Sequence, residues 1–265
     1  MKKNLILKMA LVSASTMMLL SGCREIAIET PVNKEITLLI AAASSLEYSL
    51  SNELIPLFEK EYPGIKVEGT YDSSGKLQTQ IEEGLEADIF MPASTRQMMS
   101  LEEKNLIDSD SVIELLENKI VLITSAENKD KWTKFDDIIS AKTVALGDPE
   151  SVPIGQYAKE ALTTLGIWEE IKVKASFGTN VTEVLNWVAE GSADAGIVYS
   201  TDAATSGKVV VIAEAPEGSL SEKVIYPVGI VMVSAQKEAA MKFIKFLESD
   251  EATGIFAKYG FLENR

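Results

Sequence analysis

The sequence predicts an α/β fold of two lobes, each a mostly parallel sheet flanked by helices, with a ligand cleft between the lobes. From residue 35 onward, short apolar runs alternate with helical patterns, which is typical of parallel sheets. A new apolar strand, KIVLIT, begins after Leu116, and a second long apolar strand begins near Tyr226-Pro227. The chain is therefore expected to leave the first lobe and to return to it later.

Short apolar runs between turn residues predict the strands, and they lie at 36–41, 66–70, 88–91, 119–124, 143–146, 173–176, 196–199, 209–213 and 226–234. Segments of helical periodicity predict the helices, and they lie at 46–62, 76–83, 95–104, 154–165, 181–190, 235–249 and 251–259. Several of these helices follow Ser, Thr or Asn, which cap helix N-termini well.

The N-terminus predicts an exported lipoprotein. Residues 1–22 have the basic start, apolar stretch and small residues of a signal peptide, and the ending LSGC resembles a bacterial lipobox with Cys23 as the lipidated residue. The alternative is a plain secretory signal with an incidental cysteine. We expect a tether at 23–33, lobe I at 34–118 and 227–265, and lobe II at 119–226, in a protein anchored on the outer side of the cell membrane.

Composition excludes several function classes. The formal charge of −15 makes nucleic acid an unexpected partner. The chain has no histidine and one cysteine, which excludes His-based acid–base catalysis, His/Cys zinc sites and an intrachain disulfide. No G-x-S-x-G turn surrounds Ser44, Ser45 or Ser74, and a pair of serine with Lys76 has no other support. We therefore expect neither an enzyme nor a free metal cation.

Four loops share one design, in which a strand ends, small or hydroxylated residues follow, and a helix begins: 41–45, 72–75, 149–155 and 178–182. A helix N-terminus presents unpaired N–H groups and the positive end of the helix dipole, so it can bind an anion without lysine or arginine. Each loop taken alone could simply cap its own helix. Four such loops in an exported, two-lobed protein indicate a bound oxyanion.

Several segments resemble the molybdate-binding proteins of ABC transporters, and they are AAASSL, SSGKLQTQIEEGLEADIF, LGDPESVPIGQYAKEAL, a later NV, GIVYSTDA, YPVGIV and KYGF. The resemblance covers about residues 36–261, with GDPESVPIGQYAKEAL and GIVYSTDA as its most specific parts. It implies a periplasmic-binding-protein-like fold, an ABC transporter permease as partner, a monomer, and molybdate or tungstate as the ligand, with no cofactor.

The resemblance also implies the ligand set: the hydroxyls of Ser44 and Ser74, the backbone N–H groups of Ile154 and Val181, and the hydroxyl of Tyr199. The sequence departs from the family's commonest pattern in two places. It reads SSL after AAA, so Ser45 could take the role given to Ser44. It also carries Ile154 where many members have alanine, which keeps the backbone N–H but brings a larger side chain that could reshape the pocket wall.

Three alternatives stay open at this point. The ligand could be another oxyanion, such as tungstate alone, sulfate or phosphate. Asp72 and Glu47 lie close enough to the serines in sequence for a metal site built from carboxylates. An organic solute would call for an arginine to bind a carboxylate, but the arginines after the predicted signal peptide, Arg24, Arg96 and Arg265, all lie outside the cleft motifs.

Overall fold

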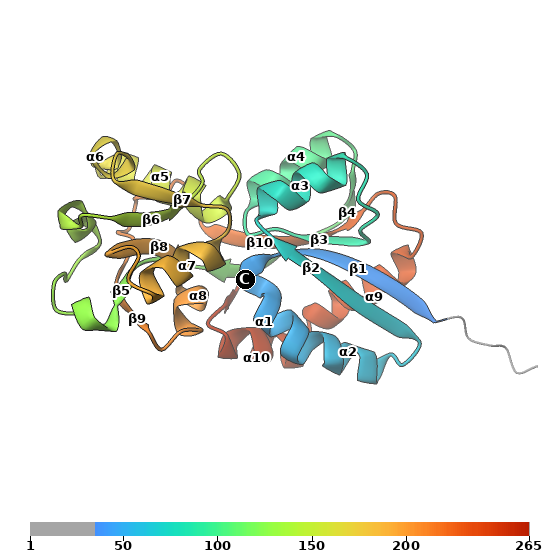
Figure 1. The fold of residues 1–265 in the computed structure, drawn as a ribbon. Helices are drawn as coiled ribbons and strands as arrows, with labels where there is room; N and C mark the ends of the chain where they lie inside the picture. The colour runs from blue at the N-terminus through green and yellow to red at the C-terminus, as the bar shows by residue number, and fades with distance from the viewer. Residues whose placement is uncertain (1–34, 265) are drawn as a thin grey trace, which may run out of the picture. The chain divides into compact units, whose positions relative to one another are not determined.

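The computed structural model describes residues 35–264, so the predicted signal peptide at 1–22, the tether at 23–33 and the lipidation site Cys23 lie outside the described residues. The described chain contains two sheets that lie side by side, and helices cover both faces of each sheet (Figure 1). The two-lobed α/β fold predicted from the sequence is confirmed.

The first sheet has the strand order β11-β4-β10-β3-β1-β2, with bounds Leu262–Glu263, Ile107–Asn118, Val224–Val231, Ile89–Met91, Ile36–Ala43 and Ile65–Asp72. Its helices are α1 (Glu47–Ser49), α2 (Ile55–Glu61), α3 (Ser74–Glu82), α4 (Thr95–Glu103), α9 (Lys237–Leu247) and α10 (Asp250–Lys258). A 3-10 turn at Ser44–Leu46 and a π-helical turn at Leu50–Leu54 join α1 and α2 into one helical run.

The second sheet has the strand order β7-β6-β8-β5-β9, with bounds Ala175–Gly178, Val144–Gly147, Ala195–Tyr199, Ile120–Ser125 and Val209–Glu214. Its helices are α5 (Pro153–Thr164), α6 (Trp168–Lys172), α7 (Val181–Ala189) and α8 (Ser200–Ala204). Two short 3-10 segments, Ala126–Asn128 and Phe135–Ser140, follow β5.

Both sheets are mixed rather than mostly parallel as expected, because the strand by which the chain enters each sheet after a crossing runs antiparallel to both of its neighbours. In the second sheet β5 is antiparallel to β8 and β9, whereas β6, β7 and β8 are parallel. In the first sheet β10 is antiparallel to β3 and β4, whereas β1 is parallel to β2 and β3. The loops that face the other lobe follow the carboxyl ends of parallel strands, namely β1, β2 and β3 in the first sheet and β6 and β7 in the second.

The two crossings between sheets lie between Asn118 and Ile120 and between Glu214 and Val224. The expected return at residue 227 falls inside β10, because Val224 pairs with Asn118 and Tyr226 with Leu116 in the first sheet. The register shifts between Tyr226 and Pro227. A proline has no N–H for the ladder and is tolerated in a strand at such an irregularity, so Pro227 does not mark the start of the strand.

The 12-residue strand β4 was missing from the expected elements. Its buried positions do not alternate, because its pairing with β10 shifts register twice. A bulge sends two successive residues to one partner and breaks the two-residue period by which a strand is found in a sequence.

Aromatic packing fills the core of the first lobe and continues to the junction of the two sheets. Phe58 of α2 packs against Phe243 of α9 with the ring centroids 4.9 Å apart.

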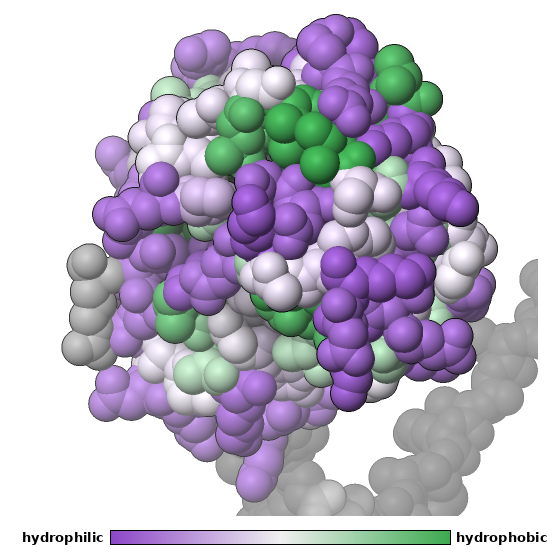
Figure 2. All heavy atoms as spheres, turned by 90° about the vertical axis from the view of Figure 1, so that its left-hand side faces the viewer, coloured by the Kyte–Doolittle hydropathy of each residue, from purple (hydrophilic) through white to green (hydrophobic). Residues whose placement is uncertain are grey.

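Hydrophilic side chains cover most of the free end of the second lobe, with a small apolar patch among them (Figure 2). Within residues 35–264, no helix is both long and apolar enough to cross a bilayer.

Candidate functional site

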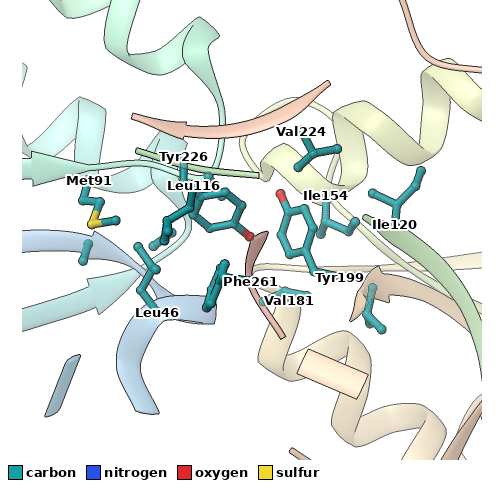
Figure 3. Packing of buried hydrophobic residues seen from close by; sticks show 14 of the residues in the cluster. Leu46, Met91, Leu116, Ile120, Ile154, Val181, Tyr199, Val224, Tyr226 and Phe261 are labelled. Carbon is teal, nitrogen blue, oxygen red and sulfur yellow. The ribbon is translucent and has the colours of Figure 1, made fainter. Parts of the chain in front are cut away.

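The four loops singled out in the sequence meet at one small cavity between the two lobes. The residues that line it come from the ends of strands and the first turns of helices, and they are Ala43, Ser44, Ser45, Asp72, Ser73, Ser74, Ala93, Val152, Pro153, Ile154, Val181 and Tyr199. All five predicted ligand residues and the alternative Ser45 are in this set. The close view of the junction shows Ile154, Val181 and Tyr199 with their neighbours in the core (Figure 3).

Ser44 and Ser45 follow β1 directly and begin the first helical run. Ser44 is buried, with 9% of its surface exposed, and it is the first residue of that turn. The Ser45 hydroxyl lies 3.0 Å from the hydroxyl of Tyr226. Because one side of Ser45 is already engaged with Tyr226, Ser44 has more of its hydrogen-bonding capacity left for a ligand.

Ser74 is the first residue of α3 and is fully buried. Its Oγ accepts a hydrogen bond from the backbone N–H of Ala93 at 2.9 Å. A hydroxyl has one proton to donate as well as its lone pairs, so this contact fixes the oxygen and leaves the O–H for an acceptor in the cavity.

Ser73 is a lining residue that the sequence analysis did not single out. Its hydroxyl is buried and has no hydrogen-bond partner within the described part of the chain. The signal for it was the doubled serine of SSG, but a helix cap is the ordinary explanation for a serine in that position. The structure shows no cap hydrogen bond from its side chain.

Ile154 and Val181 bring backbone donors to the same cavity. Ile154 is the second residue of α5 and Val181 the first residue of α7, so both N–H groups belong to first turns, where the helix has no carbonyl for them. Asn180 caps α7 by accepting from Glu183 N at 2.9 Å, which leaves the earlier N–H of Val181 unused by the cap. Both side chains are buried, as expected for core residues.

Tyr199 ends β8 and is 2% exposed. Its hydroxyl is buried and has no hydrogen-bond partner among residues 35–264. Burial raises the pKa of this hydroxyl well above its ordinary value, so the group stays protonated and keeps a hydrogen to donate. An unpaired buried hydroxyl costs free energy, and an oxyanion in the cavity would supply the missing acceptor.

No cationic side chain lines the cavity, so the available donors are neutral. Asp72 is the one charged side chain in the lining set, and it pairs with Lys76 at 3.2 Å while its Oδ1 accepts from Ser73 N at 2.7 Å. Lys76 thus forms an ion pair with Asp72 and not the Ser–Lys pair considered in the sequence analysis. Glu47 is exposed and lies outside the lining set, which removes the second carboxylate of the alternative metal site. Across residues 35–264, no cluster of three or more His, Cys, Asp or Glu could hold a metal ion.

The two lobes touch each other beside the cavity. The Arg96 guanidinium of α4 pairs with Glu160 of α5 at 2.9 Å, and the Gln97 side-chain amide donates to Gln156 Oε1 at 3.2 Å. A closed cleft lined by hydroxyls and helix N-termini from both lobes defines a two-lobed binding protein for a small anion.

Comparison with known proteins agrees with this class. Residues 38–262 match the family described as the bacterial extracellular solute-binding proteins, and the chain belongs to this family. It is 38% identical to YvgL of Bacillus subtilis (strain 168), provisionally named an ABC transporter substrate-binding lipoprotein, over 92% of this chain and 93% of the relative. It is 36% identical to the molybdate-binding protein ModA of Haemophilus influenzae, over 84% of this chain and 88% of the relative.

Among solved structures, the chain is similar to the substrate-binding domain of a provisionally assigned molybdenum ABC transporter from Clostridium difficile. The TM-score is 0.68 at 35% sequence identity, and the match covers 87% of this chain and 100% of that domain.

Proposed function

We propose that the protein captures molybdate outside the cytoplasm and delivers it to the permease of an ABC importer. The observation that carries the proposal is one small cavity between the lobes, which is lined by hydroxyls and helix N-termini of both lobes and by no cationic side chain. The name of the relative at 36% identity supports molybdate as the ligand, and the name of the relative at 38% identity supports a role with an ABC transporter. Tungstate has the same charge and shape and is proposed as a second ligand.

In the proposed complex, Ser44 and Ser74 donate from the first lobe, and Ile154, Val181 and Tyr199 donate from the second lobe. Five donors surround a tetrahedral dianion whose oxygens all accept hydrogen bonds. Hydrogen bonds to a charged partner are stronger than those between neutral groups. We therefore propose that these residues bind the ligand and do not catalyse a reaction, and we propose no cofactor.

The test is calorimetric titration of the purified protein with molybdate, tungstate, sulfate and phosphate at equal ionic strength. We expect molybdate and tungstate to bind tightly and the smaller sulfate to bind at least about a hundredfold more weakly, a difference of roughly 3 kcal/mol. Preference for sulfate or phosphate would overturn the assignment of the ligand.

We further propose that Cys23 is lipidated and that the protein acts as a monomer held at the outer face of the membrane. The LSGC ending of the predicted signal peptide supports the anchor. Replacement of Cys23 by Ala should move the protein from the membrane fraction to the soluble exported fraction. Unchanged fractionation would contradict the anchor without affecting the proposed ligand.

A further inference from the structure

A backbone hydrogen bond joins the two lobes beside the cavity. The N–H of Gly75, the second residue of α3, donates to the carbonyl oxygen of Ser151 at 3.0 Å. Ser151 lies in the loop that leads into α5, on the other lobe. On each lobe, the residue in this contact lies close in sequence to a proposed ligand residue: Ser74 precedes Gly75, and Ile154 follows Ser151 by three residues.

The space at Gly75 has no room for a side chain in this arrangement. A Cβ placed there would lie 2.2 Å from the Ser151 carbonyl oxygen and 2.9 Å from both its C and Cα atoms. These are backbone atoms, so no rotamer change can relieve the overlap. The backbone of one lobe approaches the backbone of the other as closely as a glycine permits.

The local conformation of Gly75 does not by itself require glycine. Gly75 is absent from the glycines with positive φ, and it lies in the first turn of a helix, where alanine is well tolerated. The contact with the other lobe is therefore the feature that demands the missing side chain.

Neither side of the contact can easily retreat. The Ser151 N–H donates to Asp148 O at 3.2 Å, and the Ser151 hydroxyl donates to Asp148 Oδ2 at 3.1 Å, so a closed turn holds this residue. On the other side, the hydroxyl of Ser74 is held by Ala93 N at 2.9 Å. Two stiff segments meet at one point, which fixes the distance between the N-terminal turns of α3 and α5.

We propose that Gly75 is the positioning residue that sets how far the cleft closes, and thereby how closely Ser74 and Ile154 approach one bound oxyanion. The proposal rests on the proposed function. A ligand that contacts both lobes favours the closed state, and a residue that blocks full closure weakens binding without touching the ligand.

The experiment compares Gly75→Ala with Gly254→Ala. Gly254 lies in α10, and a Cβ added there meets no atom within 4 Å, so this variant controls for a glycine-to-alanine change in a helix. Thermal unfolding of the ligand-free proteins, calorimetry with molybdate, dissociation kinetics and small-angle scattering with and without molybdate are measured for both variants and the wild type.

Gly75→Ala should unfold at the wild-type temperature or slightly above it when ligand-free, since alanine favours a helix. It should bind molybdate at least about tenfold more weakly, mostly through faster dissociation, and its radius of gyration should decrease less on binding. Gly254→Ala should also unfold at the wild-type temperature or slightly above it, for the same reason, and should behave as wild type in the other three measurements.

Wild-type affinity together with a wild-type decrease in radius for Gly75→Ala would overturn the inference. A wild-type protein that binds no molybdate would instead overturn the proposed function. In that case the closed arrangement belongs to the free protein, and Gly75→Ala has to show a larger radius of gyration than wild type. Equal radii then overturn the inference.

Discussion

The ring of Tyr199 packs edge-on against the ring of Tyr226, with the centroids 5.6 Å apart and the planes at 67° (Figure 3). Tyr199 ends β8 of the second sheet and Tyr226 lies in β10 of the first sheet, so the pair spans the junction of the lobes. The Tyr226 hydroxyl contacts Ser45 Oγ at 3.0 Å and accepts from Asn118 Nδ2 at 3.3 Å. The Tyr199 hydroxyl makes no hydrogen bond of normal length within the described residues, although the nearby Tyr226 hydroxyl contributes to the rise in its pKa. One tyrosine completes a structural network, and the other keeps its donor for the cavity.

Replacement of these two tyrosines by phenylalanine should separate binding from stability. Tyr199→Phe removes an unsatisfied buried hydroxyl, so the free energy of unfolding of the free protein should stay unchanged or rise. Its Kd for molybdate should rise about ten- to a hundredfold, because a hydrogen bond to a charged partner is worth roughly 1.5–3 kcal/mol. Tyr226→Phe should instead lower the free energy of unfolding by about 1 kcal/mol. Urea unfolding and calorimetry measure the two effects, and equal behaviour of the two variants would contradict the assignment.

Substitution of Ser74 should affect both properties. Ser74→Ala leaves the buried N–H of Ala93 without its acceptor, which should cost about 1–3 kcal/mol of unfolding free energy. The same change should weaken molybdate binding by about one to two orders of magnitude. Ser74→Asp should bind worse still, because it places a carboxylate against the dianion.

The matched control for Ser74 is Ser51→Ala, which removes an exposed hydroxyl that donates to Tyr71. This variant should bind molybdate as the wild type does. Binding of molybdate by Ser74→Asp at wild-type affinity would place the pocket elsewhere.

Added salt should change molybdate affinity little. No lysine or arginine lines the cavity, and the attraction comes from short hydrogen bonds in a buried space, which ions screen poorly. Between about 0.05 and 0.5 M sodium chloride, Kd should change by less than about threefold. The Arg96–Glu160 pair lies at the surface, where an ion pair contributes little free energy, so Arg96→Met should bind nearly as well as wild type. A steep loss of affinity with salt would indicate a basic surface site instead.

Asp202 predicts a specific pH dependence of stability. It lies buried in α8, one of its carboxylate oxygens has no partner in the described structure, and burial raises its pKa to about 7. Between the unfolded pKa near 4 and the folded pKa, the folded state keeps a proton that the unfolded state has lost. Stability therefore falls as the pH rises through this window, by up to about 1.4 kcal/mol per pH unit, and levels off above about pH 7.

The measurement for Asp202 is the free energy of unfolding of wild type and Asp202→Asn at several values between pH 5 and pH 8. The difference between the two proteins should shift in favour of the variant as the pH rises to about 7, and it should then level off. Asp130→Asn, at an exposed position, should show no such trend. A constant difference between wild type and Asp202→Asn across this range would show that Asp202 does not carry the proton.

Much of the fold and the composition of the site could be predicted from the sequence, because the signals involved are local. The start of a helix is identified by helical periodicity that follows a strand, with a serine or asparagine just before the periodic segment. Such signals marked the loops before α3 and α7, and the four loops that join a strand end to a helix start indicated an oxyanion site of neutral donors. The bulged strand β4 was missed, because its burial pattern depends on pairing with β10, more than 100 residues away in the chain.

What only the tertiary structure decided is which of these local features meet. The engagement of Ser45 by Tyr226, the unpaired hydroxyls of Ser73 and Tyr199, and the contact of Gly75 with Ser151 each depend on the packing of segments far apart in the sequence. A helix cap or a hydrophobic periodicity depends on residues that are close together in the sequence, so it can be predicted from the sequence alone. The distance between two lobes is set by side-chain volumes and backbone contacts at their junction, where a single missing Cβ decides how close they come.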